Sequence, residues 1–325
     1  MPALSRRRVG DQQRREPVEP RLISVQHLTK QFKKTVAVND LTFDVSPGVV
    51  TGFLGPNGSG KSTTMRLLLG LDHPSSGHAL INGQRYKDLA EPLHEVGALL
   101  DAKAVHPGRS ARQHLRALAA SNRISLARVD EVLDVTGISS VADKKVGTFS
   151  MGMSQRLGIA AALLGDPGVL LFDEPVNGLD PEGIRWIREF FHSLAQEGRT
   201  VFVSSHLMSE MALTAQQIIV IGRGRLITQG SVDDLTAGAQ RVVFVRARDN
   251  DALEAALRAR GATFTVEGPG FIVESLDADA IGELALRAGV ALSTLTPQRA
   301  SLEEVFMELT AEDVEYSATK PGTPE

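Results

Sequence analysis

The chain has 325 residues, which at about 150 residues per domain suggests two domains. It contains 35 Lys and Arg and 39 Asp and Glu, so the formal net charge is −4, without the basic excess that is typical of nucleic-acid-binding proteins. Cysteine is absent from the sequence, which excludes disulfides, thiolate metal sites and cysteine nucleophiles.

The first 20 residues are polar and rich in arginine. No apolar segment follows these basic residues, so they do not resemble a secretory signal peptide. Acidic residues are interleaved with the arginines, which favours a solvated, disordered tail over a segment that contacts anionic lipid. We expect the ordered chain to begin near Leu22. The apolar runs that follow are all shorter than the roughly 20 residues that cross a bilayer.

The ordered part begins with three predicted strands. Residues 22–25 and 41–45 have the composition of strands, and residues 49–54 form a third, short apolar run. A glycine-rich loop follows the third run. Residues 62–69 then have the pattern of a helix, which Gly70 ends. The order of these elements is strand, loop, helix.

The central part of the chain alternates between helices and strands. Residues 91–146 are mostly helical in pattern. Strands are predicted at 169–172, 200–204 and 218–221, and a helix with one apolar face at 181–195. Strands that alternate with helices predict an α/β domain with a parallel sheet.

A break in the pattern falls at residues 236–239, and a different arrangement follows it. The order βαββαβ is typical of a small α+β unit of the ferredoxin-like kind. Its strands are predicted at 241–246, 263–267, 271–275 and 291–295, and its helices at 250–260 and 278–288.

A last helix is predicted to begin at Ser301, because Glu304 follows three positions later in a capping-box arrangement. Its apolar face consists of Leu302, Val305, Phe306 and Leu309. Residues 311–325 contain proline and glycine and are predicted to be disordered.

The glycine-rich loop after the third strand matches the phosphate-binding pattern G-x-x-x-x-G-K-[ST]. It consists of Gly55, Pro56, Asn57, Gly58, Ser59, Gly60, Lys61, Ser62 and Thr63. Glycines let the backbone curl around phosphate groups, and the following helix directs its positive end to the same place. Lys61 is expected to reach the β- and γ-phosphates, and the Ser62 hydroxyl to coordinate Mg²⁺. The strand before the loop and the helix after it argue against a chance glycine-rich turn.

The strand at 169–172 is followed by two acids, Asp173 and Glu174. An unpaired buried charge is costly, so acids at the end of an apolar strand point to a site. Asp173 is expected to hold Mg²⁺, directly or through a water, and Glu174 to polarise the water that attacks the γ-phosphate. By itself the acidic pair is equally consistent with a surface turn. Together with the phosphate-binding loop it indicates nucleotide hydrolysis.

Three further segments make the chain resemble the ATP-binding subunits of ABC transporters. Residues 149–156 resemble the ABC signature, residues 177–180 resemble the D-loop, and Ser205-His206 resembles the switch histidine. They follow one another in the order of that family, and the resemblance covers about residues 22–235. It implies a P-loop ATPase fold with a RecA-like core, an antiparallel β subdomain and a helical subdomain.

The resemblance also implies roles for single residues. Phe32 corresponds to the aromatic residue that stacks on adenine, and the less favoured alternative is an ordinary strand residue. His206 corresponds to the residue that contacts the γ-phosphate and helps to hold the attacking water. Ser150 and Gly152 correspond to the groups that contact the γ-phosphate from the opposite subunit. Asp180 corresponds to the D-loop residue that couples the two sites of a dimer.

Two departures from the family pattern affect the site. The signature has Met151 where glycine is commonest and Met153 where glutamine is commonest, but its serine and second glycine are retained. We therefore expect phosphate contact to be retained. Residues 96–101 resemble the Q-loop, with Asp101 where glutamine or glutamate is usual. Because the shorter side chain reaches Mg²⁺ less easily, Asp101 is expected to act through a water or as a coupling hinge.

With these two departures and the C-terminal unit, the chain resembles the ATP-binding subunits of ABC-2 type exporters, of the bacitracin- and daunorubicin-resistance kind. The resemblance implies a subunit that binds ATP and Mg²⁺, dimerises on ATP with a second copy or a homologous subunit, and energises export of a drug, antibiotic or lipid-like substrate. It would act through a separate ABC-2 type membrane permease at the cytoplasmic face of the membrane, docking near residues 100–116. The C-terminal unit would be a stabilising cap, or would serve dimerisation or regulation.

Two other classes of function are alternatives to the exporter subunit. A non-transport ABC ATPase that acts on nucleic acid or ribosomes would carry long heptads between the motifs or two cassettes, and the sequence has neither, so no nucleic-acid partner is expected. A P-loop kinase or GTPase would lack the signature. The predicted organisation is a disordered tail at 1–20, an ABC nucleotide-binding domain at 21–235, an accessory α+β domain at 240–310, and a disordered tail at 311–325.

Overall fold

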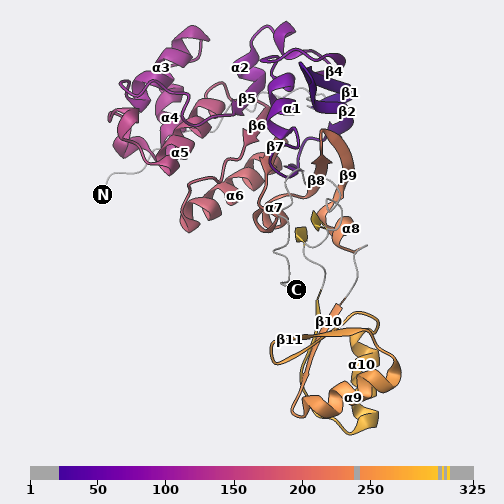
Figure 1. Ribbon diagram of the computed structural model, residues 1–325. Helices are drawn as coiled ribbons and strands as arrows, with labels where there is room; N and C mark the ends of the chain where they lie inside the picture. The colour runs from indigo at the N-terminus through magenta and orange to yellow at the C-terminus, as the bar shows by residue number, and fades with distance from the viewer. Residues whose placement is uncertain (1–21, 238–241, 299–301, 304–305, 308–325) are drawn as a thin grey trace, which may run out of the picture.

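The computed structural model describes residues 22–237, 242–298, 302–303 and 306–307. Residues 22–237, the N-terminal unit, contain a three-stranded and a six-stranded sheet, and residues 242–298, the C-terminal unit, contain a four-stranded sheet (Figure 1). The predicted tails at 1–20 and 311–325 lie outside the described residues.

The three-stranded sheet of the N-terminal unit is antiparallel, with the order β2-β1-β4. Its strands are β1 (Ile23–Phe32), β2 (Thr35–Val45) and β4 (Ser76–Ile81). The first two are longer than predicted, because shifts of register between Val25 and Gln31 interrupt the alternation of apolar and polar residues. β4 was not predicted, since its first residues are polar, glycine or only half-buried.

The six-stranded sheet has the order β5-β6-β7-β3-β8-β9. Its strands are β3 (Val50–Leu54), β5 (Val96–Leu99), β6 (Val169–Asp173), β7 (Thr200–Ser205), β8 (Gln217–Gly222) and β9 (Arg225–Ser231). The first five in the sheet order are parallel, as predicted, and β9 pairs antiparallel with β8. β5 corrects the prediction that residues 91–146 are mostly helical, because it is a strand within that stretch. Its four residues carry a weak strand signal, and its pairing with β6 stabilises it.

Helices surround this mixed sheet or pack on one another beside it. They are α1 (Lys61–Leu68), α2 (Pro92–Glu95), α3 (Ala111–Ser121), α4 (Ala127–Val135), α5 (Met151–Leu163), α6 (Pro181–Gln196), α7 (Met208–Thr214) and α8 (Val232–Ala237). Short 3-10 turns are η1 (Tyr86–Asp88), η2 (Ser139–Val141) and η3 (Val146–Thr148). Figure 1 shows α3, α4 and α5 grouped on one side of the unit and the antiparallel sheet on the other. The longest described helix, α6, has 16 residues, and no helix in the described ranges is long and apolar enough to span a bilayer.

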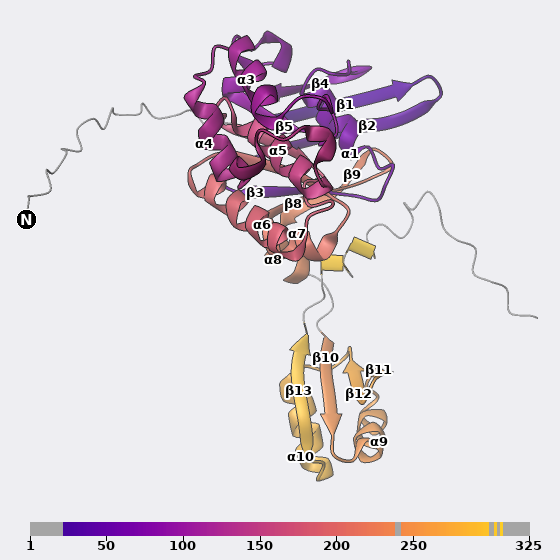
Figure 2. The same ribbon diagram turned by 90° about the vertical axis from the view of Figure 1, so that its left-hand side faces the viewer.

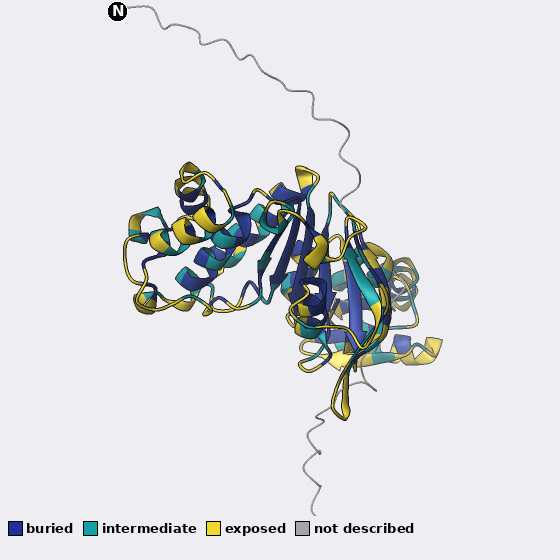
Figure 3. Ribbon diagram, turned by 90° about the horizontal axis from the view of Figure 1, so that it is seen from above, coloured by how far each residue is buried: buried dark blue, intermediate teal, exposed yellow. Residues whose placement is uncertain are grey.

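Two apolar cores lie on the two faces of the mixed sheet, and side chains of one strand alternate between them. Figure 3 shows the central strands coloured as buried. Leu170 and Phe172 of β6 face the core that contains α5 and α6, where Phe172 stacks on Phe191 with ring centroids 4.8 Å apart. Val169 and Leu171 face the core that joins the mixed sheet to α1 and the antiparallel sheet. This alternation explains why β6 is an almost continuous apolar run.

The C-terminal unit follows the predicted order βαββαβ, with each element within a few residues of its expected place. It consists of β10 (Val242–Ala247), α9 (Asn250–Arg260), β11 (Phe264–Glu267), β12 (Gly270–Val273), α10 (Ala278–Ala288) and β13 (Leu292–Gln298). The sheet is antiparallel with the order β11-β12-β10-β13, and β10 lies beside β13 in Figure 2. Both helices have strong local signals, with Asp249 and Asp277 as N-caps.

The chain returns to the N-terminal unit after β13. Leu302 and Phe306 are buried in the core that contains α5 and α6. Both belong to the apolar face of the predicted last helix, and residues 302–303 and 306–307 are helical. Its other predicted members, Ser301, Glu304, Val305 and Leu309, lie outside the described residues.

Candidate functional site

Strand register collects most of the predicted site residues at one edge of the mixed sheet. The carboxyl ends of β3, β5, β6 and β7 meet there because these strands are parallel. Leu54 pairs with Ser205, so the phosphate-binding loop and His206 leave adjacent strands. Asp173 pairs with Ser204, and Phe172 with Leu99. The acidic pair therefore lies between His206 and the segment that contains Asp101.

The phosphate-binding loop has a conformation that requires its glycines. Gly60 has a φ of +105°, and a Cβ there would lie 2.5 Å from the carbonyl oxygen of Ala37 in β2. A Cβ at Gly55 would lie 2.4 Å from Ser59 Oγ. The backbone N–H of Gly224 donates to the carbonyl of Ser59 at 2.9 Å. The loop is thus held between β2 and the turn that joins β8 to β9.

Lys61, the first residue of α1, turns its side chain back into this loop. Its Nζ donates to the carbonyl oxygens of Gly55 at 2.7 Å and Pro56 at 3.2 Å, and only 6% of the residue is exposed. Burial lowers the pKa of Lys61 below its usual value, and the charges of Glu174 and Asp173 oppose this effect. The ammonium group is therefore positioned by the loop and faces two carboxylates.

The loop fits a phosphate group. Gly60, at the start of α1, provides no side-chain cap and the first turn contains no acid, so the positive end of the helix faces the loop together with Lys61. Ser59 Oγ is buried and has no hydrogen-bond partner among the described residues. Asn57, Gly58 and Ser62 are exposed, and Pro56 and Thr63 are partly buried.

Asp173 and Glu174 are oriented by Ser204 of β7. The Ser204 hydroxyl donates to Asp173 Oδ1 and accepts from the backbone N–H of Glu174 at 3.0 Å. Glu174 has a φ of +50°, a left-handed conformation that residues other than glycine rarely adopt. Ser204 was missed by sequence reasoning, because only the register of β6 with β7 brings it to the acidic pair.

The carboxylate of Glu174 lies between Lys61 and His206. Its Oε1 is 3.9 Å from Lys61 Nζ, and its Oε2 is 2.8 Å from His206 Nδ1. The Glu174 side chain is 21% exposed, so solvent reaches a carboxylate that is held on both sides. This arrangement can orient a water and accept its proton.

The signature and the D-loop meet at the beginning of α5 and α6. Ser150 caps α5 by accepting from the N–H of Met153 at 3.2 Å, and Asp180 caps α6 by accepting from the N–H of Gly183 at 2.9 Å. Both caps are exposed, and Gly152 is partly buried.

The structure accounts for one departure from the family pattern, which is Met151 in the signature. A Cβ at Gly178 in the D-loop would lie 2.1 Å from Met151 Cγ, so the methionine covers this glycine. The extra side chain at position 151 is therefore accommodated by packing on the D-loop.

Phe32 and Asp101 lie at the periphery of the site. Phe32 ends β1, is 44% exposed, and has Lys30 Nζ 4.7 Å from its ring centroid. Asp101 is exposed and accepts from the N–H of Lys103 at 2.8 Å, so it shapes the turn after β5. Within the described ranges, neither Phe32, Asp101 nor Ser150 shares a hydrogen bond or ion pair with the group of Lys61, Glu174 and His206.

Gln155 is a second residue that sequence reasoning missed. It lies on α5, and its amide donates to the carbonyl oxygens of Glu174 and Asn177. The signal available in the sequence was its position inside the signature segment, as a polar residue among the apolar residues of α5.

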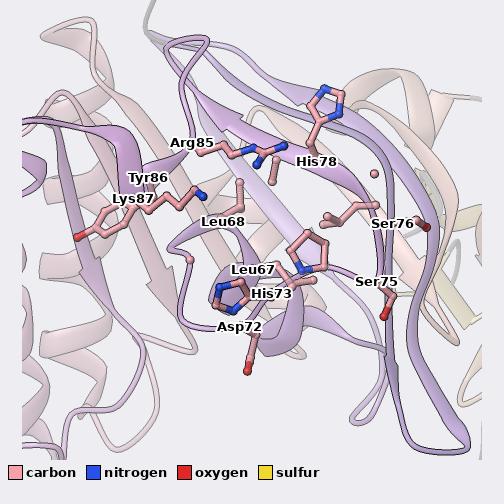
Figure 4. A pocket seen from close by; sticks show the side chains of 15 residues that line it. Leu67, Leu68, Asp72, His73, Ser75, Ser76, His78, Arg85, Tyr86 and Lys87 are labelled. Carbon is pink, nitrogen blue, oxygen red and sulfur yellow. The ribbon is translucent and has the colours of Figure 1, made fainter.

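Two cavities lie beside these elements. One, of about 340 Å³, is at the opposite end of α1 from the phosphate-binding loop (Figure 4). Leu67 and Leu68 line it together with the basic side chains of Arg85 and Lys87. The other, of about 330 Å³, is next to the signature. It is lined by Ala102, Lys103, Val105, Pro107, Val146, Gly147, Phe149, Met151 and Ser154.

Known proteins are similar to this chain in both sequence and fold. A family model described as ABC transporter matches residues 38–177, and one described as a domain of unknown function matches residues 241–303. The chain is 34% identical to the uncharacterized ABC transporter ATP-binding protein YhcH of Bacillus subtilis, over 90% of this chain and 97% of that protein. It is 40% identical to the bacitracin transport ATP-binding protein BcrA of Bacillus licheniformis, over 66% of this chain and 71% of that protein. A solved structure of the ATP-binding subunit of an ABC transporter matches with a TM-score of 0.61 and 27% identity, over 67% of this chain and 95% of that one.

Proposed function

The chain belongs to the ATP-binding proteins of ABC transporters, and from this we propose that it is the subunit that energises an ABC-2 type exporter. It binds ATP, and hydrolysis of ATP is its reaction. The observation that carries the proposal is the position of the Glu174 carboxylate, between Lys61 and His206 and beside a loop shaped for phosphate.

Each residue of this group has a distinct part in the proposed hydrolysis. Glu174 accepts the proton of the attacking water, and His206 holds the carboxylate through its 2.8 Å contact and faces the γ-phosphate. Lys61 and the backbone N–H groups of residues 55–63 bind the β- and γ-phosphates and stabilise the charge that develops on them. Phe32 is proposed to stack on the adenine ring, since its ring is exposed at the end of β1.

Mg²⁺ is the metal ion that the site suits. Hydroxyl and carboxylate oxygens are the ligands that this ion prefers, and it is usually held by one or two carboxylates together with the phosphates of a nucleotide. Ser62 and Asp173 would hold it, and Asp101 would act through a water. The ion would neutralise charge on the phosphate oxygens.

Hydrolysis is proposed to take place between two chains. One phosphate-binding loop and one signature occur in the sequence, and in the family these two face each other across a dimer. Ser150 and Gly152 would contact the γ-phosphate bound by the partner, which is a second copy or a homologous subunit. Asp180 would couple the two sites. The exposure of both helix caps, Ser150 and Asp180, supports this assignment.

A separate membrane permease is proposed to dock beside the signature, at the cytoplasmic face of the membrane. The cavity of about 330 Å³ supports this, because four of its lining residues lie within the predicted docking range of 100–116, namely Ala102, Lys103, Val105 and Pro107. It joins the segment after Asp101 to Met151 of the signature, so docking would reach the nucleotide site. The substrate is proposed to be a drug, an antibiotic or a lipid-like molecule, since one relative, BcrA of Bacillus licheniformis, is a bacitracin transport ATP-binding protein.

The proposed domain boundaries are 21–235 for the nucleotide-binding domain and 240–310 for the accessory domain. The separate apolar core of the C-terminal unit supports this division. We propose a ferredoxin-like fold for that unit, which its βαββαβ order and its sheet order β11-β12-β10-β13 support.

Replacement of Glu174 by glutamine tests this function. The variant keeps the shape of the side chain and loses the base, so hydrolysis is expected to fall by about 10²–10⁴-fold while ATP still binds. ATP-bound dimers should then accumulate, detectable by size-exclusion chromatography with light scattering, and a polytopic membrane protein should co-purify. Glu189→Gln, an exposed change on α6, is the matched control. Hydrolysis at the native rate would refute the role of Glu174. Recovery of ribosomes or DNA in place of a membrane protein would favour the non-transport alternative.

A further inference from the structure

Gln155 joins the helix that begins at the signature to the loop that carries Glu174. It lies on the second turn of α5 and is 5% exposed. Its Nε2 donates to the carbonyl oxygens of Glu174 and Asn177, each at 3.3 Å. A single buried amide therefore bridges two carbonyls of one loop, and both bonds depend on the donor character of this side chain.

The loop that Gln155 contacts is held in an unusual conformation. Glu174 has a φ of +50°, which persists only where surrounding contacts maintain it. Its N–H donates to Ser204 Oγ, and its carbonyl accepts from the N–H of Asn177 at 3.2 Å as well as from Gln155. Of these three hydrogen-bond partners of the Glu174 backbone, Gln155 is the one that lies on α5.

A second contact joins α5 to this loop. Met151, at the start of α5, packs on Gly178, and a Cβ at Gly152 would lie 3.2 Å from the carbonyl oxygen of Gly178. The helix thus contacts the loop at Gly178 through its first turn and at Glu174 and Asn177 through Gln155. These contacts form a continuous path from Ser150, at the beginning of α5, to Glu174.

We propose that Gln155 is a positioning residue that couples the two nucleotide sites of the dimer. The inference rests on the proposed function, in which Ser150 and Gly152 face the partner's nucleotide and Glu174 faces the nucleotide of its own chain. When the signature closes on the partner's nucleotide, Gln155 draws the backbone of Glu174 with it. The carboxylate is then oriented for attack only when both sites are closed.

Gln155→Glu isolates the two donated hydrogen bonds. Glutamate has the same shape and no amide donor, so its carboxylate would face the carbonyl oxygens of Glu174 and Asn177. We expect kcat for ATP to fall at least about tenfold, while the affinity for a fluorescent ATP analogue remains close to that of the native chain. Gln229→Glu, an exposed position on β9, is the matched control and should keep the native kcat.

Mixed dimers separate coupling from a local effect. In the first, one chain carries Gln155→Glu and its partner carries Glu174→Gln, so the remaining base lies on the altered chain. In the second, one chain carries both substitutions and its partner is native, so the remaining base faces the altered signature. The reference pairs a native chain with a Glu174→Gln chain.

Coupling between two sites is reciprocal, so loss of Gln155 should also weaken the closure of its own signature on the partner's nucleotide. Coupling therefore predicts that both mixed dimers hydrolyse ATP more slowly than the reference. Slowing of the first alone would show that Gln155 acts only on its own Glu174 and would overturn the coupling. Native rates in both would overturn the role altogether. If Gln155→Glu does not fold, the same pair built with Gln155→Met removes the donors without adding a charge. Failure of the reference to dimerise on ATP would instead refute the proposed function, because the reference retains Gln155 in both chains.

Discussion

Glu174 has a partner at each of its polar groups. Its N–H donates to Ser204, its carbonyl accepts from Gln155, and its two carboxylate oxygens face Lys61 and His206. These partners come from β7, α5, α1 and the segment after β7. A side chain held in this way would need little reorganisation in the proposed hydrolysis, as a preorganised site requires.

The contact between His206 and Glu174 can be tested by removing the imidazole. His206→Ala is expected to lower kcat by about 10²-fold, because the carboxylate loses its 2.8 Å partner and the attacking water loses a neighbour. The affinity for ATP should change much less, since Lys61 and the loop are intact. Steady-state ATPase rates and titration with a fluorescent ATP analogue check this. His94→Ala, an exposed change on α2, should behave as the native protein, and a native kcat in His206→Ala would contradict the assignment.

Close packing of α5 on β5 positions the segment that leads to Asp101. A Cβ at Gly97 of β5 would lie 2.0 Å from the carbonyl oxygen of Ala162, and a Cβ at Gly158 of α5 would lie 2.4 Å from a methyl group of Leu99. Glycine in each element permits this approach of backbone to backbone. The strand and the helix that begins at the signature are therefore held in one arrangement.

Gly97→Ala should disrupt this packing. The added methyl group overlaps backbone, which cannot move as a side chain can, so the free energy of unfolding should fall by about 3 kcal/mol. Urea denaturation followed by circular dichroism measures the change. The control is Gly230→Ala, whose Cβ would lie 3.8 Å from Leu235 in ordinary contact, with an expected change within about 0.5 kcal/mol. Equal stability of the two variants would contradict the tight approach.

The N-terminal unit completes its core with residues that follow the C-terminal unit in the sequence. Leu302 and Phe306 are buried in the core that contains α5 and α6, while Val243 and Val245 of β10 belong to the separate core of the C-terminal unit. The C-terminal unit is therefore connected to the N-terminal unit at both of its ends. We therefore expect the segment that returns after the C-terminal unit to contribute to the stability of the N-terminal unit.

Phe306→Ala tests this connection in the full chain. Loss of a buried phenyl ring is expected to lower the free energy of unfolding of the N-terminal unit by about 3 kcal/mol. Thermal unfolding followed with a fluorescent ATP analogue reports on that unit. Met307→Ala, at a position that is 63% exposed, should change stability by no more than about 0.5 kcal/mol. An unchanged melting temperature in Phe306→Ala would show that the returning segment does not stabilise the unit.

Features that depend on neighbouring residues in the sequence could be predicted without the structure. The helices of the C-terminal unit begin at Asp249 and Asp277 and end before Gly261 and Gly289, as their capping residues indicate. β6 followed from its apolar run. Both kinds of signal act over a few residues, so they survive in any arrangement of the rest of the chain.

Elements stabilised by distant partners were not predicted. β5 is four residues long, and its pairing with β6 and the approach of α5 decide its conformation. β9 forms an antiparallel edge that the alternation of strands and helices does not reveal. Short or polar segments like these have little conformational preference of their own, so the partner decides.

The sequence by itself determined the phosphate-binding loop, the acidic pair and the histidine, because each is a short pattern placed at the end of a strand. It also determined the family to which these patterns belong. Only the tertiary structure decided that Ser204 and Gln155 hold Glu174, and that Met151 covers Gly178. These contacts join residues about 20 to 30 positions apart, and the register of β6 with β7 and the packing of α5 on the D-loop bring them within reach.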